Sequence, residues 1–215
     1  MSSAFEMGKS ITEAVRFVSI VGAECDHLAN MIREELSRML LLPEVAGRYK
    51  AAGKWLTHYQ TDAKDWVYVD FGSSLPVIVK PKRSVGGYLV FQISLSDLGI
   101  AAQGNQEPLL HVGWWTDPVD LEELKMGFPL HVDTEFDVVL EDERLFCWVK
   151  PHVENEWCYS VRLTDINNPT DVQNQIIQPM KALLLRQPAS EAFKNTTVVR
   201  YAKVEEAGQY RILPR

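Results

Sequence analysis

The amino-acid sequence predicts an α+β fold: a largely antiparallel sheet of six to eight strands, flanked by a long N-terminal helix and a second helix nearer the C-terminus. Apolar residues recur at helical spacing towards both ends of the chain, and between 65 and 163 their period changes to two. Short polar turns separate the strand-like stretches, which favours antiparallel pairing. With the helices outside the strand region, the 215 residues suit a single α+β domain.

The first predicted element is a long helix over 10–42. Ser10 and Glu13 have the spacing of a capping box, and Pro43 ends the periodic pattern. The apolar face of this helix consists of Ile11, Val15, Val18, Cys25, Leu28, Ile32, Leu36 and Met39. At 1.5 Å per residue the helix would be about 50 Å long, which is more than one small sheet covers. Either Gly22 therefore divides it, or part of it packs on another protein or on a second copy of the chain. A helix that lies across its own sheet with a ragged end is the alternative interpretation, and it is favoured over a dimer seam.

The sheet region is predicted over 65–163 and contains seven candidate strands. They are 66–71, 76–80, 88–95, 109–115, 130–140, 144–149 and 157–163. Turn residues separate them, among them the glycine-serine segment 72–74. A short helix is expected between two of the strands, with Asp117 as its N-cap, Pro118 in its first turn and Gly127 at its end.

The C-terminal part of the chain is predicted to form a helix followed by a hairpin. The helix spans 168–186, where Asn168 is a good N-cap and Pro169 suits the first helical position. Pro179 lies inside this helix and should kink or divide it. The final hairpin is predicted over 196–214.

Acidic residues are concentrated in one part of the chain. The 117–156 segment holds twelve carboxylates and three basic residues, a net charge of −9, whereas the whole chain carries −7. A field of this sign attracts basic proteins or cations and repels nucleic acid, although a solvated face is the alternative interpretation. The residues predicted to contact a basic partner are Glu141, Asp142, Glu143, Asp120 and Glu123, with Trp115 as an aromatic anchor if it is exposed.

A second set of residues suits a divalent metal ion. His131, Asp133 and Glu135 alternate along one predicted strand, so their side chains project from the same face. Carboxylates with one imidazole are ligands for Mg²⁺ or Mn²⁺, which would support a metal-dependent hydrolase or nuclease. Residues two apart on a strand stand about 6.5–7 Å apart, so three in succession cannot hold one ion unaided. A polar outer face of the sheet explains the same alternation.

Several classes of protein are disfavoured by the composition and the motifs. No apolar run reaches the roughly 18 residues of a membrane span, and the N-terminal residues do not have the pattern of a secretory signal. The three cysteines, widely spaced and odd in number, suggest neither a disulfide framework nor a zinc site. The sequence has no Gly-x-Ser-x-Gly elbow and no glycine-rich phosphate loop. We therefore expect a cytoplasmic protein with reduced thiols and no cofactor.

The leading functional expectation is a non-enzymatic intracellular binding protein, such as an inhibitor, an immunity-type protein or an adaptor, whose acidic surface engages a basic protein. The net charge disfavours nucleic acid, in spite of a basic stretch over 80–83. One alternative is the metal-dependent hydrolase or nuclease. Another is a self-associating structural subunit that forms a homodimer through its first helix.

Overall fold

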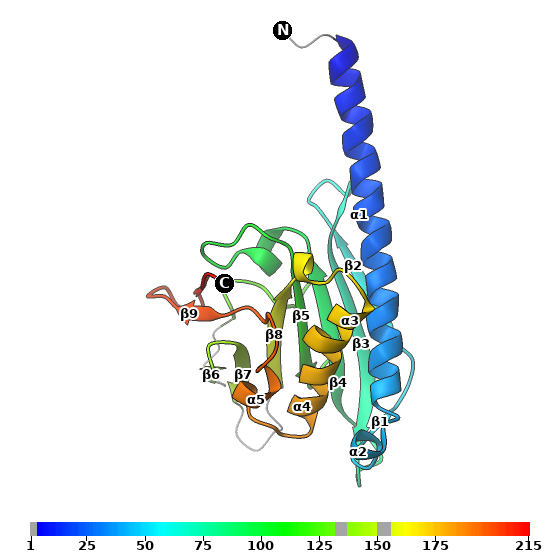
Figure 1. Cartoon of the computed structure of the whole chain (residues 1–215), viewed down its shortest axis with the longest axis vertical. Helices are drawn as coiled ribbons and strands as arrows, with labels where there is room; N and C mark the ends of the chain where they lie inside the picture. Colours follow the sequence, from blue (N-terminus) through cyan, green and yellow to red (C-terminus); the bar gives the residue numbers. More distant parts are fainter. Residues whose placement is uncertain (1–3, 132–136, 150–155) are drawn as a thin grey trace.

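The computed structural model describes residues 4–131, 137–149 and 156–215 and confirms the α+β class. An eight-stranded antiparallel sheet carries the long N-terminal helix and the helices of the C-terminal region on one face (Figure 1). The helices are α1 (Ala4–Met39), α2 (Pro43–Ala46), α3 (Pro169–Val172), α4 (Gln178–Leu184) and α5 (Ala189–Ala192). The strands are β1 (Tyr49–Ala51), β2 (Leu56–Thr61), β3 (Tyr68–Val79), β4 (Val85–Ser94), β5 (Leu109–Trp115), β6 (Asp137–Glu141), β7 (Leu145–Val149), β8 (Glu156–Arg162), β9 (Tyr201–Lys203) and β10 (Tyr210–Ile212).

Helix α1 is continuous through Gly22, so the division at this glycine, one of the alternatives drawn from the sequence, does not occur. The helix also begins before the predicted capping box. Ser10 lies inside it, and the Ser10 hydroxyl donates to the Glu6 carbonyl oxygen at 3.0 Å. A serine within a helix can bond the carbonyl four residues earlier, and the same spacing of polar residues then looks like a helix start in the sequence. The prediction of a first helix is right, but its start at Ser10 is wrong.

The strand order is β1-β3-β4-β5-β8-β7-β6, and β2 also pairs with β3. Strand β3 runs straight through the 72–74 segment, where the sequence predicted a turn. An added Cβ on Gly72 would lie 2.6 Å from Val119 Cγ1, so glycine is needed there because another segment packs directly on the strand. The Ser74 hydroxyl accepts from the Val119 amide at 2.8 Å. Gly72 and Ser74 are therefore explained by the segment around Val119, which packs closely on this face of β3.

Both faces of the sheet are covered. On the helix face, residues such as Phe91, Val112 and Tyr159 pack against α1 and the C-terminal helices. The second face is covered by the chain that follows β5 and by the β9–β10 hairpin. The predicted short helix over 117–127 is wrong. This stretch is irregular, and the backbone amide of Leu124 donates to Asp120 while the Asp120 amide donates to Leu124 at 2.9 Å.

The C-terminal helical region is confirmed, with an irregularity where the proline predicts one. The Asn168 side chain caps α3 and accepts from the amides of Thr170 and Asp171. A π-helical turn over Gln173–Ile177 separates α3 from α4, and Pro179 lies in the first turn of α4. A π turn leaves a backbone carbonyl without its usual partner, as an internal proline requires. The β9–β10 hairpin falls within the predicted 196–214.

Candidate functional site

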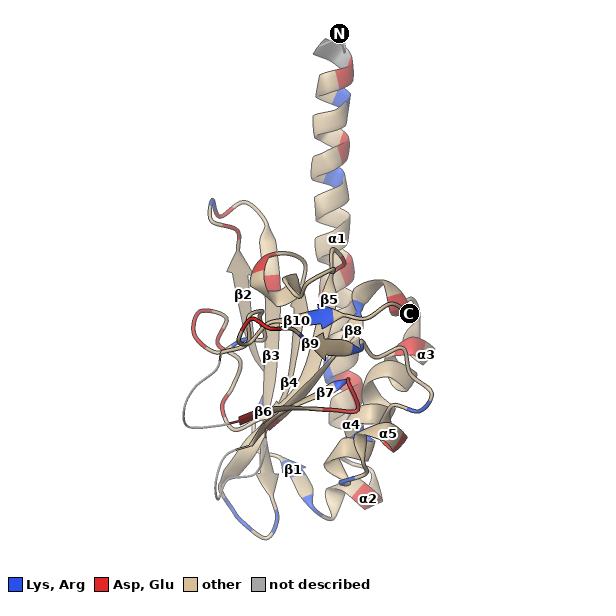
Figure 2. Ribbon diagram, turned by 90° about the vertical axis from the view of Figure 1, so that its left-hand side faces the viewer, with Lys and Arg blue, Asp and Glu red and all other residues tan. Residues whose placement is uncertain are grey.

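The acidic residues predicted to contact a partner divide between two parts of the molecule. Glu141, Asp142 and Glu143 lie at the turn between β6 and β7, near one edge of the sheet. Asp120 and Glu123 lie in the segment that packs over β3 through Val119. Strands β3 and β7 are four positions apart in the sheet, or about 19 Å at roughly 4.8 Å per step. In the view of Figure 2 the acidic residues are likewise spread over several loops and helices.

The two acidic groups differ in how far they are compensated. At the β6–β7 turn Arg144 Nη1 lies 3.5 Å from Asp142 Oδ2, and Arg200 forms an ion pair with Glu143. Asp120, Glu122 and Glu123 are exposed and form no salt bridge with any described residue. The uncompensated negative charge among these residues therefore lies over 117–123 rather than at the turn.

The predicted aromatic anchor is not at the surface. Trp115 is 6% exposed and packs in the core of the second face, and Trp114 is 3% exposed on the helix face, where it meets the Tyr49 ring edge-on at 5.8 Å. Because both faces of the sheet are covered, alternation along β5 places both indoles in a core. The expectation that Trp115 could anchor a partner is wrong.

The predicted metal ligands are only partly within the described chain. His131 is exposed, whereas Asp133 and Glu135 lie outside the described residues. Among the residues that the structure does describe, no group of three His, Cys, Asp or Glu side chains could hold a metal ion. The Mg²⁺ or Mn²⁺ site therefore remains a sequence-based prediction.

A buried polar cluster on the second face joins β3 and β4 to the segment after β5. The Gln92 side-chain nitrogen donates to Ser94 Oγ at 2.8 Å and to the Met126 carbonyl at 2.9 Å, and the Met126 amide donates back to Gln92 at 2.8 Å. Lys125 Nζ lies 3.6 Å from the fully buried Asp70 carboxylate. Burial raises the pKa of Asp70. These contacts fix the 117–130 segment to the sheet, and we assign them a structural role.

His111 and Ser160 have the geometry of a base and a hydroxyl, but neither reaches solvent. Ser160 Oγ is 2.8 Å from His111 Nδ1, and His111 Nε2 is 2.8 Å from the Gly99 carbonyl. Burial lowers the pKa of His111 to about 4, so the ring is neutral near pH 7. Its Nε2–H then donates to Gly99, and the Ser160 hydroxyl donates to Nδ1. A substrate has no access to either group, so this pair also stabilises the sheet.

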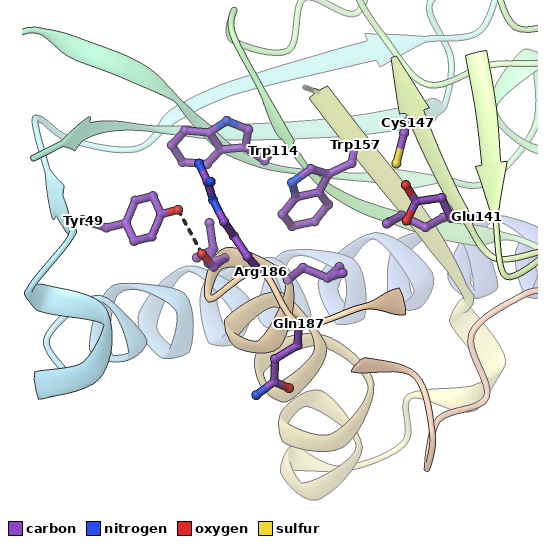
Figure 3. A pocket seen from close by; sticks show the side chains of 10 residues that line it. Tyr49, Trp114, Glu141, Cys147, Trp157, Arg186 and Gln187 are labelled. Atoms are coloured by element: carbon purple, nitrogen blue, oxygen red, sulfur yellow. Dashed lines mark hydrogen bonds between the residues drawn. The ribbon is translucent and has the colours of Figure 1, made fainter. Parts of the chain in front are cut away.

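A pocket of about 480 Å³ lies between the end of α4 and strands β5, β7 and β8 (Figure 3). Trp114, Trp157 and Cys147 contribute to its sheet side, and the Tyr49 hydroxyl at its rim donates to the Leu184 carbonyl at 3.0 Å. Burial, reinforced by Glu141, raises the pKa of Cys147 to about 12. The thiol is therefore protonated near neutral pH and is not a nucleophile. The pocket could receive a flat apolar group, but its described side chains include no activated catalytic pair.

The most unusual surface is the N-terminal half of α1, which stands clear of the sheet (Figure 1). We call residues 6–21 the projecting helix and residues 25–39 the packed half. The projecting helix exposes six large apolar side chains: Met7 (60%), Ile11 (60%), Val15 (65%), Phe17 (67%), Val18 (47%) and Ile20 (50%). In the packed half the corresponding apolar side chains Cys25, Ala29, Ile32, Leu36 and Met39 are buried.

Most of the exposed apolar residues of α1 and its buried residues belong to one stripe, whereas Ile20 lies on the opposite face of the helix. Met7, Ile11, Ala14, Val18, Val21, Cys25, Leu28 and Ile32 follow one another in steps of four and three. This spacing keeps side chains on one face of a helix and is the seam of a coiled coil. The face that the packed half buries on the sheet therefore continues into solvent along the projecting helix. The periodicity and the excess length were visible in the sequence, but which part of the helix the sheet leaves uncovered was not.

Apolar grooves flank the base of the projecting helix. One, of about 230 Å³, lies between α1 and the start of β3 and is lined by Phe17, Val18, Val67 and Tyr68 among others. Next to it Trp66 is 86% exposed at the tip of the β2–β3 hairpin. A second groove, of about 540 Å³, lies between α1 and the residues leading into α3. The exposed apolar surface is thus widest where the helix leaves the body.

No protein-family model, curated protein or solved structure matches this chain, so its function is inferred from this geometry. In the part of the chain that the structure describes, no helix is long and apolar enough to cross a membrane.

Proposed function

We propose that this protein is a non-enzymatic binding protein whose main docking element is the projecting helix. The observation that carries this proposal is the single apolar stripe of α1, buried over its packed half and exposed over 6–21. The polar clusters described above, around Gln92 and around His111, are buried in the sheet, where a substrate cannot reach them. They therefore do not favour an enzyme. A binding role uses the surface that is most unusual.

The size of the exposed apolar surface supports docking. With side-chain areas on the order of 150–250 Å², the exposed fractions along the projecting helix amount to roughly 600 Å² of apolar surface. The aromatic hairpin tip beside it, with Tyr59, Trp66 and Tyr68, brings the total to roughly 1,000 Å². The largest apolar patch of a typical monomer is about 300–600 Å², and a standard interface buries about 800 Å² on each partner.

The stability of an isolated helix leads to the same proposal. Most helical stability in proteins comes from packing an apolar face, and an unpacked helix of about 15 residues is marginal in water. The projecting helix also contains Gly8, and Gly22 lies at its base; each glycine costs about 1 kcal/mol relative to alanine in a helix interior. A docked partner would supply the packing that the sheet supplies to the other half.

The test compares two charge-introducing double variants on opposite faces of the projecting helix. Ile11→Glu/Val18→Glu places two carboxylates on the stripe, and Lys9→Glu/Arg16→Glu places the same two side chains on the polar face. We expect wild type and the polar-face variant to retain a stoichiometric bound partner from the native host. The stripe variant should lose it at least tenfold, as measured by quantitative mass spectrometry of the captured material.

The control for folding is circular dichroism of all three proteins at low protein concentration, which should show the same sheet and the same unfolding midpoint because the substituted positions are exposed in the single chain. Equal retention of the partner by both variants would contradict a docking role for the stripe.

The second candidate function is the acidic surface expected from the sequence, with a basic protein as its partner. It is favoured by the uncompensated charge of Asp120, Glu122 and Glu123. Neutralising these three residues should weaken association and reduce its salt dependence. Neutralising Glu141, Asp142 and Glu143 should have a smaller effect, because Arg144 and Arg200 already compensate that turn. Association that is insensitive to salt would contradict this candidate.

A further inference from the structure

We propose that the occupant of the projecting helix is a second copy of this chain, arranged antiparallel about a two-fold axis that passes close to Thr12 and Glu13. This inference rests on the proposed function, since it names the partner for the same surface. It makes the protein a homodimer in which each projecting helix packs along the other and its tip reaches the base of the second copy.

The direction of the pair follows from where the sheet begins. A second helix that lies on the stripe in parallel would continue past Val21 alongside the packed half. There Cys25, Ile32 and Leu36 are already buried against the chain's own sheet, so the parallel helix would have to occupy the volume of that sheet. An antiparallel helix approaches from the other end and can stop before this point. Only the antiparallel arrangement is therefore free of this overlap.

The register follows from the same limit. In antiparallel coiled coils the two kinds of seam position face each other, which allows Ile11 to lie opposite Ala14 or opposite Val21; opposite Met7, the helices would overlap only over 4–14 and leave Val18 uncovered. The second choice would bring Met7 of the second copy level with Cys25, where the sheet already covers the stripe. The first choice places Met7 of the second copy opposite Val18. The helix of the second copy then begins level with Val21. At 1.5 Å per residue the overlapping helices are about 25 Å long.

The base of each projecting helix offers a receiving surface. In this register the second copy's Met7 lies beside Val18, which lines the groove of about 230 Å³ together with Phe17, Val67 and Tyr68. A protruding apolar helix and an apolar groove on one chain are self-complementary about a two-fold axis, because each copy provides both parts. Without Ile20, which faces away from the seam, the projecting helix and the hairpin tip provide roughly 900 Å² of exposed apolar surface per chain, close to what a standard dimer buries per subunit.

The charges on the projecting helix are compatible with self-association. It carries Glu6, Lys9, Glu13 and Arg16, which sum to zero, and Lys9 Nζ lies 3.7 Å from the Glu13 carboxylate. The chain as a whole carries −7, so two copies repel one another unless their acidic parts stay apart. Helix α1 lies over the β3 side of the sheet, and the acidic β6–β7 turn lies towards the opposite edge (Figure 1). Pairing through the projecting helices therefore joins two helices without net charge, while the uncompensated Asp120, Glu122 and Glu123 lie over β3 on the opposite face of the sheet from α1.

The test uses molar mass and disulfide cross-linking of the full chain. Light scattering after size exclusion should give twice the 24.5 kDa chain mass for wild type. The Val18→Glu variant should raise the dimer dissociation constant about 100-fold or more, because it buries a charge in the seam. The Arg16→Glu variant on the polar face should leave the constant within about threefold.

Cross-linking then decides the direction and the register. Under oxidation an equimolar mixture of Met7→Cys and Val18→Cys chains should form 7–18 disulfide dimers, whereas either variant alone should not, since its two cysteines would lie about 16 Å apart. The three native cysteines are buried and do not interfere. Efficient cross-linking of each variant with itself would overturn the antiparallel arrangement.

A further outcome separates this inference from the proposed function. Wild type that stays monomeric up to about 1 mM would overturn the homodimer. If the Ile11→Glu/Val18→Glu protein nevertheless loses its host partner, the docking role stands with a different occupant. If it retains that partner, both proposals fail.

Discussion

The two halves of α1 carry the same apolar pattern in different surroundings. Ile32, in the packed half, is fully buried, while Ile11, in the projecting helix, is 60% exposed. Both occupy the same stripe, and no break in the helix separates them. Helical periodicity therefore predicts which face of a helix will be covered, but it does not predict whether the chain's own sheet or another molecule covers it.

Polar contacts reinforce the difference between the halves. In the packed half Arg33 Nη1 donates to Thr57 Oγ1 at 2.9 Å, and the Trp55 indole donates to Ser37 Oγ at 3.1 Å. Gln173 from the π turn donates to Glu35 at 2.7 Å. In the projecting helix the contacts of Ser10 and Lys9 are with residues of the helix itself. The packed half is thus tied by side-chain hydrogen bonds to β2 and to the C-terminal helices, whereas the projecting helix meets the body only at its base, where Val21 packs against the core.

The largest expected difference between the two halves is in the effect of the same isoleucine-to-alanine substitution on the free energy of unfolding. Ile32→Ala should lower the free energy of unfolding by about 2–5 kcal/mol, since it removes a fully buried side chain and leaves a cavity. Ile11→Ala should change it by less than about 0.5 kcal/mol in the dilute monomer. Urea unfolding at low protein concentration measures both, and repeating it at high concentration tests the dimer.

A similar loss for both substitutions at low concentration would mean that the projecting helix packs on the body in solution. In the dimer, by contrast, Ile11→Ala should become destabilising only as the concentration rises, because folding and association are then coupled.

The second prediction concerns the thiol at the border between the halves. Burial, with smaller contributions from Asp26 and Glu24, raises the pKa of Cys25 from 9.0 to about 11. At pH 8 the thiolate fraction is therefore about 100-fold lower than for an unperturbed cysteine, and it increases about tenfold per pH unit up to about pH 11. Alkylation of Cys25 should be at least 100-fold slower than alkylation of Thr12→Cys, an exposed position on the projecting helix.

Mass spectrometry after timed iodoacetamide treatment distinguishes the two thiols. Equal alkylation rates at pH 8 would show that the stripe is already open to solvent at Cys25, so that the border lies further along α1.

A smaller difference in unfolding free energy is expected when one arginine in each half of α1 is replaced by alanine. Arg33→Ala removes the hydrogen bond to Thr57 and a longer one to Ser73 Oγ at 3.4 Å, and it should cost about 1 kcal/mol of unfolding free energy. Arg16→Ala in the projecting helix is the matched control and should cost less than about 0.5 kcal/mol. Thermal unfolding of the two variants under the same conditions compares them directly, and equal midpoints would count against the anchoring role of Arg33.

Much of the fold could be predicted from local patterns. The bounds of β5, the Asn168 cap and the irregularity near Pro179 all follow from residues close in sequence. The errors arose where distant segments determine the structure. Gly72 stands inside a strand because Val119 packs on it, and the buried segment after Trp115 has no helical periodicity of its own. Sequence patterns do not contain such contacts.

The candidate site shows the same limit. The stripe of α1 and its excess length were visible in the sequence, as was the possibility of a second copy. The aromatic tip at Trp66 and the groove beside Val18 depend on how β2 and β3 are placed against the helix, so no local pattern indicates them. Trp115 failed as an anchor for the corresponding reason: whether a strand has an open face is decided by segments elsewhere in the chain.

The smallest expected effect comes from the glycine between the halves. An added Cβ at Gly22 meets nothing within 4 Å, so alanine fits the single chain, and it should stabilise the helix there by up to about 1 kcal/mol. Slower amide hydrogen exchange in the projecting helix of Gly22→Ala at low concentration would show this gain, with Gly8→Ala as a control nearer the end. In the proposed dimer Gly22 lies beside the tip of the second helix, so the same methyl group should weaken association by several-fold. If the variant gains helix stability but keeps its dimer affinity, the second helix does not contact this turn. That result would contradict the register inferred from Met7 and Val18.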